Sequence, residues 1–453
     1  MQVYASGTND PETLKEAQQI PYKACCDQLP GKNMREISDN NANSCINVND
    51  STPLEFTTDS PVSGIYCIFQ YPCKWTVKLP DGTAINGGQN GFMHEYMAFN
   101  TNVTEFEMCF EGKVQLSEIY AFTDGKLPDW VQIWEPPCQK ADLLVLPTHA
   151  DDEFLWFGGA LPYYAGELGY NVQVVYLVNH QNQTYRRHEL LNGLWRVGVK
   201  HYPVISSPFM DKKPAGKTYA DATAAYGFNH MLEYQVKILR RFAPKVVLGH
   251  DVYGEYGHGA HMLNARTLLE ALPLTSDPDS FPDSAAEYGT CTVGKCYIHL
   301  WRKNTIQIEW SSLVLSHFGG KSAFEMAKDG YACHKSQGNV HKLLEEGNYD
   351  CRKFGLAYTT VGYDTPETND MFEHIDMSQY IQNNKDDDII KNDKEAVPNT
   401  DQTVNDKSSQ KTNDKVAVNM YTIIAVAFVL TVVTALAVLL TWGNRKTRRR
   451  LNE

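Results

Sequence analysis

Residues 143–161, LLVLPTHADDEFLWFGGAL, form the stretch that decides the fold. A near-continuous apolar run of this kind is typical of a strand that is covered on both faces. The run ends at Pro147, and a histidine and three consecutive acids follow it: His149, Asp151, Asp152 and Glu153. Adjacent carboxylates repel one another, so we expect a positive group to hold them at the end of the strand.

The sequence around this stretch predicts an α/β domain over residues 139–377. Short apolar runs recur in the order DLLVLPT, NVQVVYLV, KHYPVI and PKVVLGH. Helical segments are predicted between them, at 153–169, 185–198 and 219–242. Alternating strands and helices indicate a doubly wound, mostly parallel sheet, in which ligands bind beyond the carboxyl ends of the strands.

Other parts of the chain differ in composition from this domain. Residues 1–50 are polar and contain cysteines, and we expect them to be irregular. Residues 51–138 contain short runs rich in aromatic and β-branched residues, which predict a β-sandwich-like domain. Residues 378–415 are almost entirely polar, so we expect a disordered stalk.

The C-terminal region predicts a membrane anchor over residues 416–443. The run MYTIIAVAFVLTVVTALAVLLTW is uncharged and long enough to cross a bilayer, and a basic tail follows at 444–453. Positive charge concentrates on the cytosolic side, so the chain is expected to be a single-pass type I protein with its ectodomain outside or lumenal. The N-terminal MQVYASGTND lacks the features of a signal peptide. Either a signal is missing from this sequence, or the protein is tail-anchored with cytosolic domains.

Composition restricts the partners and the compartment. The formal charge of −13 provides no basic field for nucleic acid. Eleven cysteines suit an oxidising compartment with several disulfides, although buried free thiols are the alternative. Glycosylation sequons begin at Asn49, Asn102 and Asn182 and are consistent with a glycoprotein. The sequence does not indicate an oligomeric state.

Two histidine-containing motifs lie at the same predicted edge of the sheet. His149 precedes Asp152 by three residues, and His258 and His261 follow the later run PKVVLGH. Two histidines and one carboxylate leave an open coordination position, which is typical of catalytic zinc, and another divalent transition metal is compatible with the same ligands. Taken singly, HADDE could be a helix N-terminus and HGAH two surface histidines.

Three motifs resemble those of the LmbE-like deacetylases, the family that includes the N-acetylglucosaminyl-phosphatidylinositol de-N-acetylases. PTHADDE resembles the first signature of the family, YGHGAH its second, and YRRHELLNGLWRVGV an intervening segment. The resemblance covers residues 142–272 well and extends more loosely to about 377. It implies a zinc-dependent hydrolase that removes an N-acetyl group from an N-acetylglucosamine-type sugar conjugate.

The resemblance also implies roles for individual residues. Zinc would be held by His149, Asp152 and His261. Asp151 would be the general base, His258 would stabilise the oxyanion or protonate the amine, and Tyr256 would polarise the amide carbonyl. Arg186 would contact the substrate, and Asp211 would lie near the sugar. The sequence departs from the family at Gly259 and Ala260, which replace a proline and an acid, and Asp251 or Glu255 is a candidate substitute for that acid.

The substrate remains open at this level, because a free glycan, a glycolipid and a peptidoglycan fragment all fit. The alternative function is a membrane-anchored carbohydrate-binding or adhesion protein with a degenerate deacetylase fold. Intact candidate metal ligands and an intact candidate base favour the enzyme.

Overall fold

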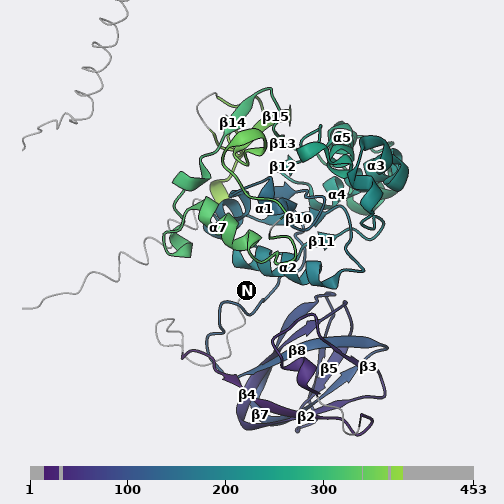
Figure 1. Ribbon diagram of the computed structural model, residues 1–453, viewed down its shortest axis with the longest axis vertical. Helices are drawn as coiled ribbons and strands as arrows, with labels where there is room; N and C mark the ends of the chain where they lie inside the picture. The colour runs from purple at the N-terminus through teal and green to yellow at the C-terminus, as the bar shows by residue number, and fades with distance from the viewer. Residues whose placement is uncertain (1–14, 30–33, 339, 366–368, 381–453) are drawn as a thin grey trace, which may run out of the picture. The chain divides into compact units, whose positions relative to one another are not determined.

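The computed structural model describes residues 15–29, 34–338, 340–365 and 369–380 (Figure 1). These residues all fall in one compact unit, 1–388. Within them, no helix has both the length and the apolar character needed to cross a bilayer. The predicted membrane helix at 416–443, the basic tail at 444–453 and nearly all of the predicted stalk lie outside the described residues.

The α/β part is built on a seven-stranded sheet (Figure 1). Its strands, in spatial order, are β11 (Val204–Ile205), β10 (Val172–Tyr176), β9 (Leu143–Val145), β12 (Val246–Gly249), β13 (Lys295–His299), β15 (Lys353–Thr359) and β14 (Thr305–Gln307). The first five strands are parallel, and β15 and β14 are antiparallel. The predicted α/β fold with a mostly parallel sheet is therefore confirmed. The strand order reverses at β9, because β10 and β11 lie on one side of it and β12 and β13 on the other. β9 is the strand that precedes His149.

Both faces of this sheet are buried, as the apolar run of β9 predicts. Leu143 and Val145 pack into one core cluster, whereas Leu144 and Leu146 pack into another. The first cluster receives α2 (Thr184–Arg196) and α7 (Ala323–Tyr331). The second receives α3 (Tyr219–Tyr226), α4 (Phe228–Phe242) and α5 (Gly259–Leu274), and α6 (Pro282–Tyr288) contacts α4.

Two of the predicted helices are interrupted at glycines. The segment 153–169 forms the short α1 (Asp152–Leu155) and the π-helical η2 (Leu161–Glu167). Gly158 lies between them at φ 55°, where a Cβ atom would come within 2.6 Å of Trp310 Nε1. The segment 219–242 divides into α3 and α4 at Gly227, which has φ 76° and ψ 126°. Neither backbone conformation continues a helix.

The N-terminal part is an antiparallel sheet. Its strands are β1 (Gln19–Ile20), β2 (Tyr22–Cys25), β3 (Ile46–Val48), β4 (Leu54–Phe69), β5 (Trp75–Lys78), β6 (Ala84–Gly87), β7 (His94–Phe110) and β8 (Val114–Phe122). The predicted β-structure is present, but a sandwich of two sheets is not confirmed, because hydrogen bonds link all eight strands into one sheet. The segment 1–50 also differs from its predicted irregular conformation, since β1 and β3 pair with β8 and β2 pairs with β4.

The predicted disulfides are not found among the residues that the structure describes. Cys67, Cys138, Cys296 and Cys351 are packed in the apolar cores, where a thiol behaves as a small hydrophobic side chain. The alternative of buried free thiols therefore describes these cysteines better than a disulfide framework does.

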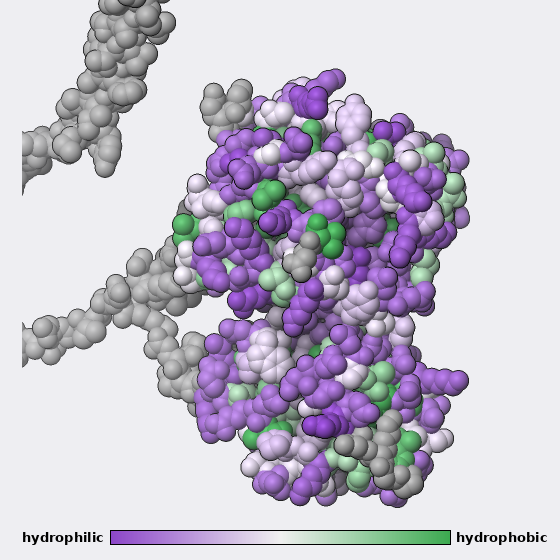
Figure 2. Space-filling model, viewed as in Figure 1, coloured by the Kyte–Doolittle hydropathy of each residue, from purple (hydrophilic) through white to green (hydrophobic). Residues whose placement is uncertain are grey.

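The face of the molecule in Figure 2 is largely hydrophilic, with small scattered apolar areas.

Candidate active site

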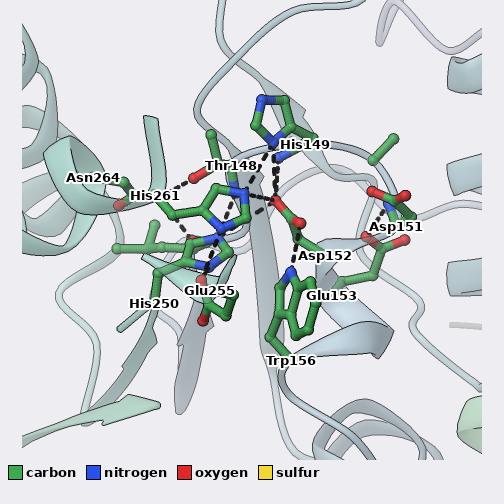
Figure 3. Close-up of polar contacts among 12 residues, drawn as sticks. Thr148, His149, Asp151, Asp152, Glu153, Trp156, His250, Glu255, His261 and Asn264 are labelled. Atoms are coloured by element: carbon green, nitrogen blue, oxygen red, sulfur yellow. Dashed lines mark hydrogen bonds and ion pairs between the residues drawn. The ribbon is translucent and has the colours of Figure 1, made fainter. Parts of the chain in front are cut away.

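The two histidine motifs meet because β9 and β12 are adjacent parallel strands. The loop after β9 carries His149 and leads into α1, whose first residue is Asp152. The loop after β12 leads into α5, where His258 is the N-cap and His261 lies in the first turn. Figure 3 shows His149, Asp152 and His261 pointing toward one another from these two segments.

Three ligand atoms converge in this cluster. His149 Nδ1 lies 3.2 Å from Asp152 Oδ2 and 3.2 Å from His261 Nε2. His261 Nε2 lies 3.3 Å from Asp152 Oδ2. Ligands at about 2.0–2.1 Å from a tetrahedral ion are about 3.3 Å apart, so these residues fit a zinc ion without rearrangement. Asp152 is anchored on its other oxygen, because the Trp156 indole Nε1–H donates to Oδ1 at 2.7 Å.

The protonation pattern separates His250 from the ligands. The Thr148 backbone N–H donates to His250 Nε2 at 2.9 Å, so this nitrogen presents its lone pair to the peptide. His250 Nδ1 then carries the proton and donates to Glu255 Oε2 at 2.9 Å. His250 is close enough to Asp152 and His261 to form a three-ligand metal group with them. However, the lone pair on His250 Nε2 already accepts the hydrogen bond from the Thr148 N–H. We therefore assign it a supporting position.

Glu255 connects three histidines, and it occupies the role that the sequence leaves open between Asp251 and Glu255. Its Oε2 accepts from His250 and from His261 Nδ1 at 2.7 Å, and its Oε1 accepts from His299 Nδ1 at 2.8 Å. The carboxyl group is fully buried. Burial alone would raise the pKa of Glu255, but His250 and the hydrogen bonds from all three rings hold it well below its usual range. This carboxylate fixes His261 with Nε2 toward Asp152, the arrangement that orients metal-binding histidines.

Asp151 faces a different set of groups from Asp152. Its backbone has φ 108°, an uncommon conformation for a residue with a side chain. Its N–H donates to Glu153 Oε2 at 2.7 Å, and Glu153 Oε1 lies 2.7 Å from His334 Nε2. The buried Glu153–His334 pair therefore supports the strained turn, consistent with a structural role for His334.

The Asp151 side chain is buried next to Arg186. Arg186 Nη2 lies 3.3 Å from Asp151 Oδ1 and also donates to the Ala150 carbonyl. Burial, followed by the charge of Asp152, raises the pKa of Asp151 to about 8, although Arg186 acts to lower it. Asp152 behaves oppositely: burial would raise its pKa, but His261 and His149 hold it well below the usual range. The two adjacent acids therefore occupy different electrostatic environments.

His258 and Tyr256 lie at the mouth of the cluster. The His258 ring centroid is 4.8 Å from that of His149 and 4.3 Å from that of His261. Burial and the neighbouring histidines lower the pKa of His258 to about 2, which favours the neutral ring. Tyr256 is half-exposed and stacks on His341 with ring centroids 4.7 Å apart.

Asp211 also approaches the site, on the side of His180. Asp211 Oδ2 lies 3.4 Å from His180 Nδ1, and the Ala150 N–H donates to His180 Nε2 at 3.3 Å. The structure thus brings all eight predicted site residues to one region. The sequence interpretation missed the supporting residues His250, His299 and His341. Of these, only His250 carries a local signal, since it directly follows the β12 run.

Known proteins are similar in sequence to part of this chain. A 1D-myo-inositol 2-acetamido-2-deoxy-alpha-D-glucopyranoside deacetylase of Geodermatophilus obscurus is 25% identical over 179 residues, which are 34% of this chain and 61% of the relative. The corresponding Saccharopolyspora erythraea deacetylase 2 is 27% identical over 162 residues, 31% of this chain and 59% of the relative. The resemblance to the LmbE-like deacetylases is thereby confirmed. The chain spans less than two thirds of the length of these relatives.

A solved structure gives a weaker likeness to this chain. The N,N'-diacetylchitobiose deacetylase from Pyrococcus horikoshii has a TM-score of 0.34 and 18% identity, over 44% of this chain and 72% of the other. No family model matches the chain.

Proposed function

We propose that this chain is a metal-dependent amidohydrolase that removes the acetyl group from an N-acetylglucosamine-type sugar. The observation that carries this proposal is the spacing of His149 Nδ1, Asp152 Oδ2 and His261 Nε2, which are 3.2–3.3 Å apart. The curated relatives are named for a substrate with an acetamido sugar, in agreement with this class.

The three residues would hold zinc and leave a fourth position open. When bound there, zinc supplies a Lewis acid that lowers the pKa of water. Asp151 directly precedes the candidate ligand Asp152, and its raised pKa suits it to take a proton from the attacking water. We assign Asp151 to this base role and not to the ligands, because its carboxylate faces Arg186.

Amide hydrolysis also requires groups that act on the carbonyl oxygen and the leaving amine. His258 and Tyr256 lie at the open side of the site and are suited to donate to the developing oxyanion. Arg186 is close to fully buried against Asp151, so we assign it to orienting this base as well as to contacting substrate. Asp211, about a third exposed, is placed to accept a hydrogen bond from a sugar hydroxyl.

The test is acetate release from N-acetylglucosamine conjugates by the purified chain, with metal content measured on the same sample. We expect about one zinc per site and acetate release that a chelator abolishes. Absence of both bound metal and acetate would overturn the proposal. The alternative of a non-enzymatic binding protein is not favoured, since the ligand set and the candidate base are complete.

A further inference from the structure

A groove of about 960 Å³ lies beside the candidate active site. Its walls come from the loop after β12, the turn after β13, and the segment around η7 (Gly347–Tyr349). The first two follow the carboxyl ends of adjacent parallel strands, so the groove shares its sheet edge with the site. Its volume is at the upper end of the range for small-molecule pockets, roughly 300–1,000 Å³.

Aromatic side chains stand along this groove. Tyr253 is 69% exposed and Tyr349 is 37% exposed, and the partly buried Trp301 lies on the turn after β13. Ile306 and Phe354 are buried beneath them. Large aromatic rings left accessible beside a polar surface commonly mark a ligand-binding site.

The polar groups in the groove carry charges of both signs. Asp251 is acidic, and Arg302 and Lys353 are basic, with Lys353 Nζ paired to Asp350 Oδ2 at 3.2 Å. Gln307 and Asn348 supply neutral donors and acceptors. This balance does not suit a polyanion, which requires an excess of positive charge. A pyranose ring has an apolar C–H face and a rim of hydroxyl groups, so exposed aromatic faces with scattered polar side chains match it.

The groove adjoins the candidate active site at the loop after β12. Gly257, which lines the groove, lies between Tyr256 and His258 in the chain. The Tyr349 ring centroid lies 6.5 Å from that of the half-exposed Tyr256. A ligand in the groove would therefore lie next to the candidate active site.

The loop that carries Tyr253 is held in place by local hydrogen bonds. The Tyr253 N–H donates to Asp251 Oδ1 at 3.1 Å, and Arg266 Nε donates to the Val252 carbonyl at 3.0 Å. Such a loop loses little conformational entropy when a ligand binds.

We propose that this groove binds the sugar units that extend beyond the acetylated sugar, so that the substrate is an oligosaccharide chain. This proposal rests on the proposed deacetylase function of the adjacent site. It predicts that affinity and catalytic efficiency increase with chain length until the groove is filled.

The experiment measures acetate release by the full chain from N-acetyl chito-oligosaccharides of one to six sugars. We expect kcat/KM to increase at least tenfold from the monosaccharide to the tetrasaccharide. Tyr253→Ala should remove most of this increase. Tyr363→Ala is the matched control, because Tyr363 is 68% exposed and does not line the groove. Equal kcat/KM at all lengths, or an equal loss in both variants, would overturn the proposal.

A binding measurement separates this proposal from the proposed function. Calorimetry on the Asp151→Asn variant should show tighter binding of the tetrasaccharide than of the disaccharide. When Tyr253→Ala is combined with Asp151→Asn, binding of the tetrasaccharide should weaken markedly and binding of the disaccharide should change little. If longer sugars bind in this way but the native chain releases no acetate, the proposed deacetylase function is wrong and the proposal of a sugar-binding groove is supported. If acetate is released equally from sugars of every length, the proposal of a sugar-binding groove is wrong and the deacetylase function is supported.

Discussion

His261 Nδ1 lies 2.7 Å from Glu255 Oε2, while His261 Nε2 lies 3.3 Å from Asp152 Oδ2. The ring is therefore held between a buried carboxylate and the candidate metal position. Because a carboxylate only accepts, Glu255 requires the proton on Nδ1 and leaves the Nε2 lone pair for a metal. The same carboxylate holds His250 and His299, so one residue orders two rings at the ends of β12 and β13 and a third in the first turn of α5.

Replacing Glu255 should weaken metal binding without abolishing it. Glu255→Gln removes the charge and replaces one acceptor by a donor that cannot bond to an imidazole N–H. We expect zinc affinity to fall about 10- to 100-fold, the usual effect of losing such a supporting carboxylate. Competition with a chromophoric chelator measures this affinity, and circular dichroism checks the fold.

Glu270→Gln is the control for this change, because Glu270 is exposed on the same helix as His261. Its zinc affinity should equal that of the native chain. An unchanged affinity in folded Glu255→Gln would show that the hydrogen bond does not orient the ligand.

The adjacent acids should respond differently to the same substitution. Asp152→Asn removes a charged ligand, so it should lose bound zinc. Asp151→Asn should retain zinc and lower turnover about 10²- to 10⁴-fold, because only the candidate base is changed. Metal analysis and acetate release on both variants check this. Loss of zinc from both variants to the same extent would mean that the two side chains share the ligand role.

Much of this fold could be predicted from the sequence, because strands and their adjacent motifs are marked by local residue patterns. The apolar run before His149 predicts a strand buried on both faces, and the structure places alternate residues of β9 in two cores. Since β9 and β12 are parallel neighbours, the motifs after them are brought together. This is why residues more than 100 positions apart in the chain, such as His149 and His261, could be assigned to one site.

Contacts without a local pattern could not be predicted in this way. His299 ends β13, and nothing in its neighbourhood shows that it bonds to Glu255, 44 residues earlier. The stacking of His341 on Tyr256 depends equally on tertiary packing. The break at Gly158 was missed because helical periodicity does not reveal that Trp310 occupies the space beside this residue.

Removing the metal should lower the thermal stability of the protein. Because the ligands come from two segments of the chain, we expect zinc to bind the folded state much more tightly than the unfolded state. At a free zinc concentration of 100 times Kd the stabilisation is about 2.7 kcal/mol, which corresponds to roughly 5–10 °C in a domain of this size. Differential scanning fluorimetry with and without chelator measures the shift. Asp152→Asn is the control and should show no such shift, whereas an equal shift in that variant would place the stabilising metal elsewhere.

A buried acid in the N-terminal sheet should make stability depend on pH. Glu118 on β8 is inaccessible to solvent, and its Oε1 accepts from the Asn41 N–H at 2.8 Å. Burial, followed by the hydrogen bond with Asp39, raises the pKa of Glu118 from 4.5 to about 7. Between these two values the folded state binds more protons than the unfolded state. The stability due to this proton is therefore complete below pH 4.5 and is lost as pH rises toward 7.

Glu118→Gln should remove this pH dependence. The amide keeps the acceptor for Asn41 and offers a donor toward Asp39 in place of a second negative charge. We expect the variant to be about 1–3 kcal/mol more stable than the native chain at pH 7 and close to it at pH 4.5. Urea unfolding at both pH values measures the difference, and Glu105→Gln, on the exposed part of β7, is the control. If the difference in unfolding free energy were the same at both pH values, Glu118 would not be the group that titrates.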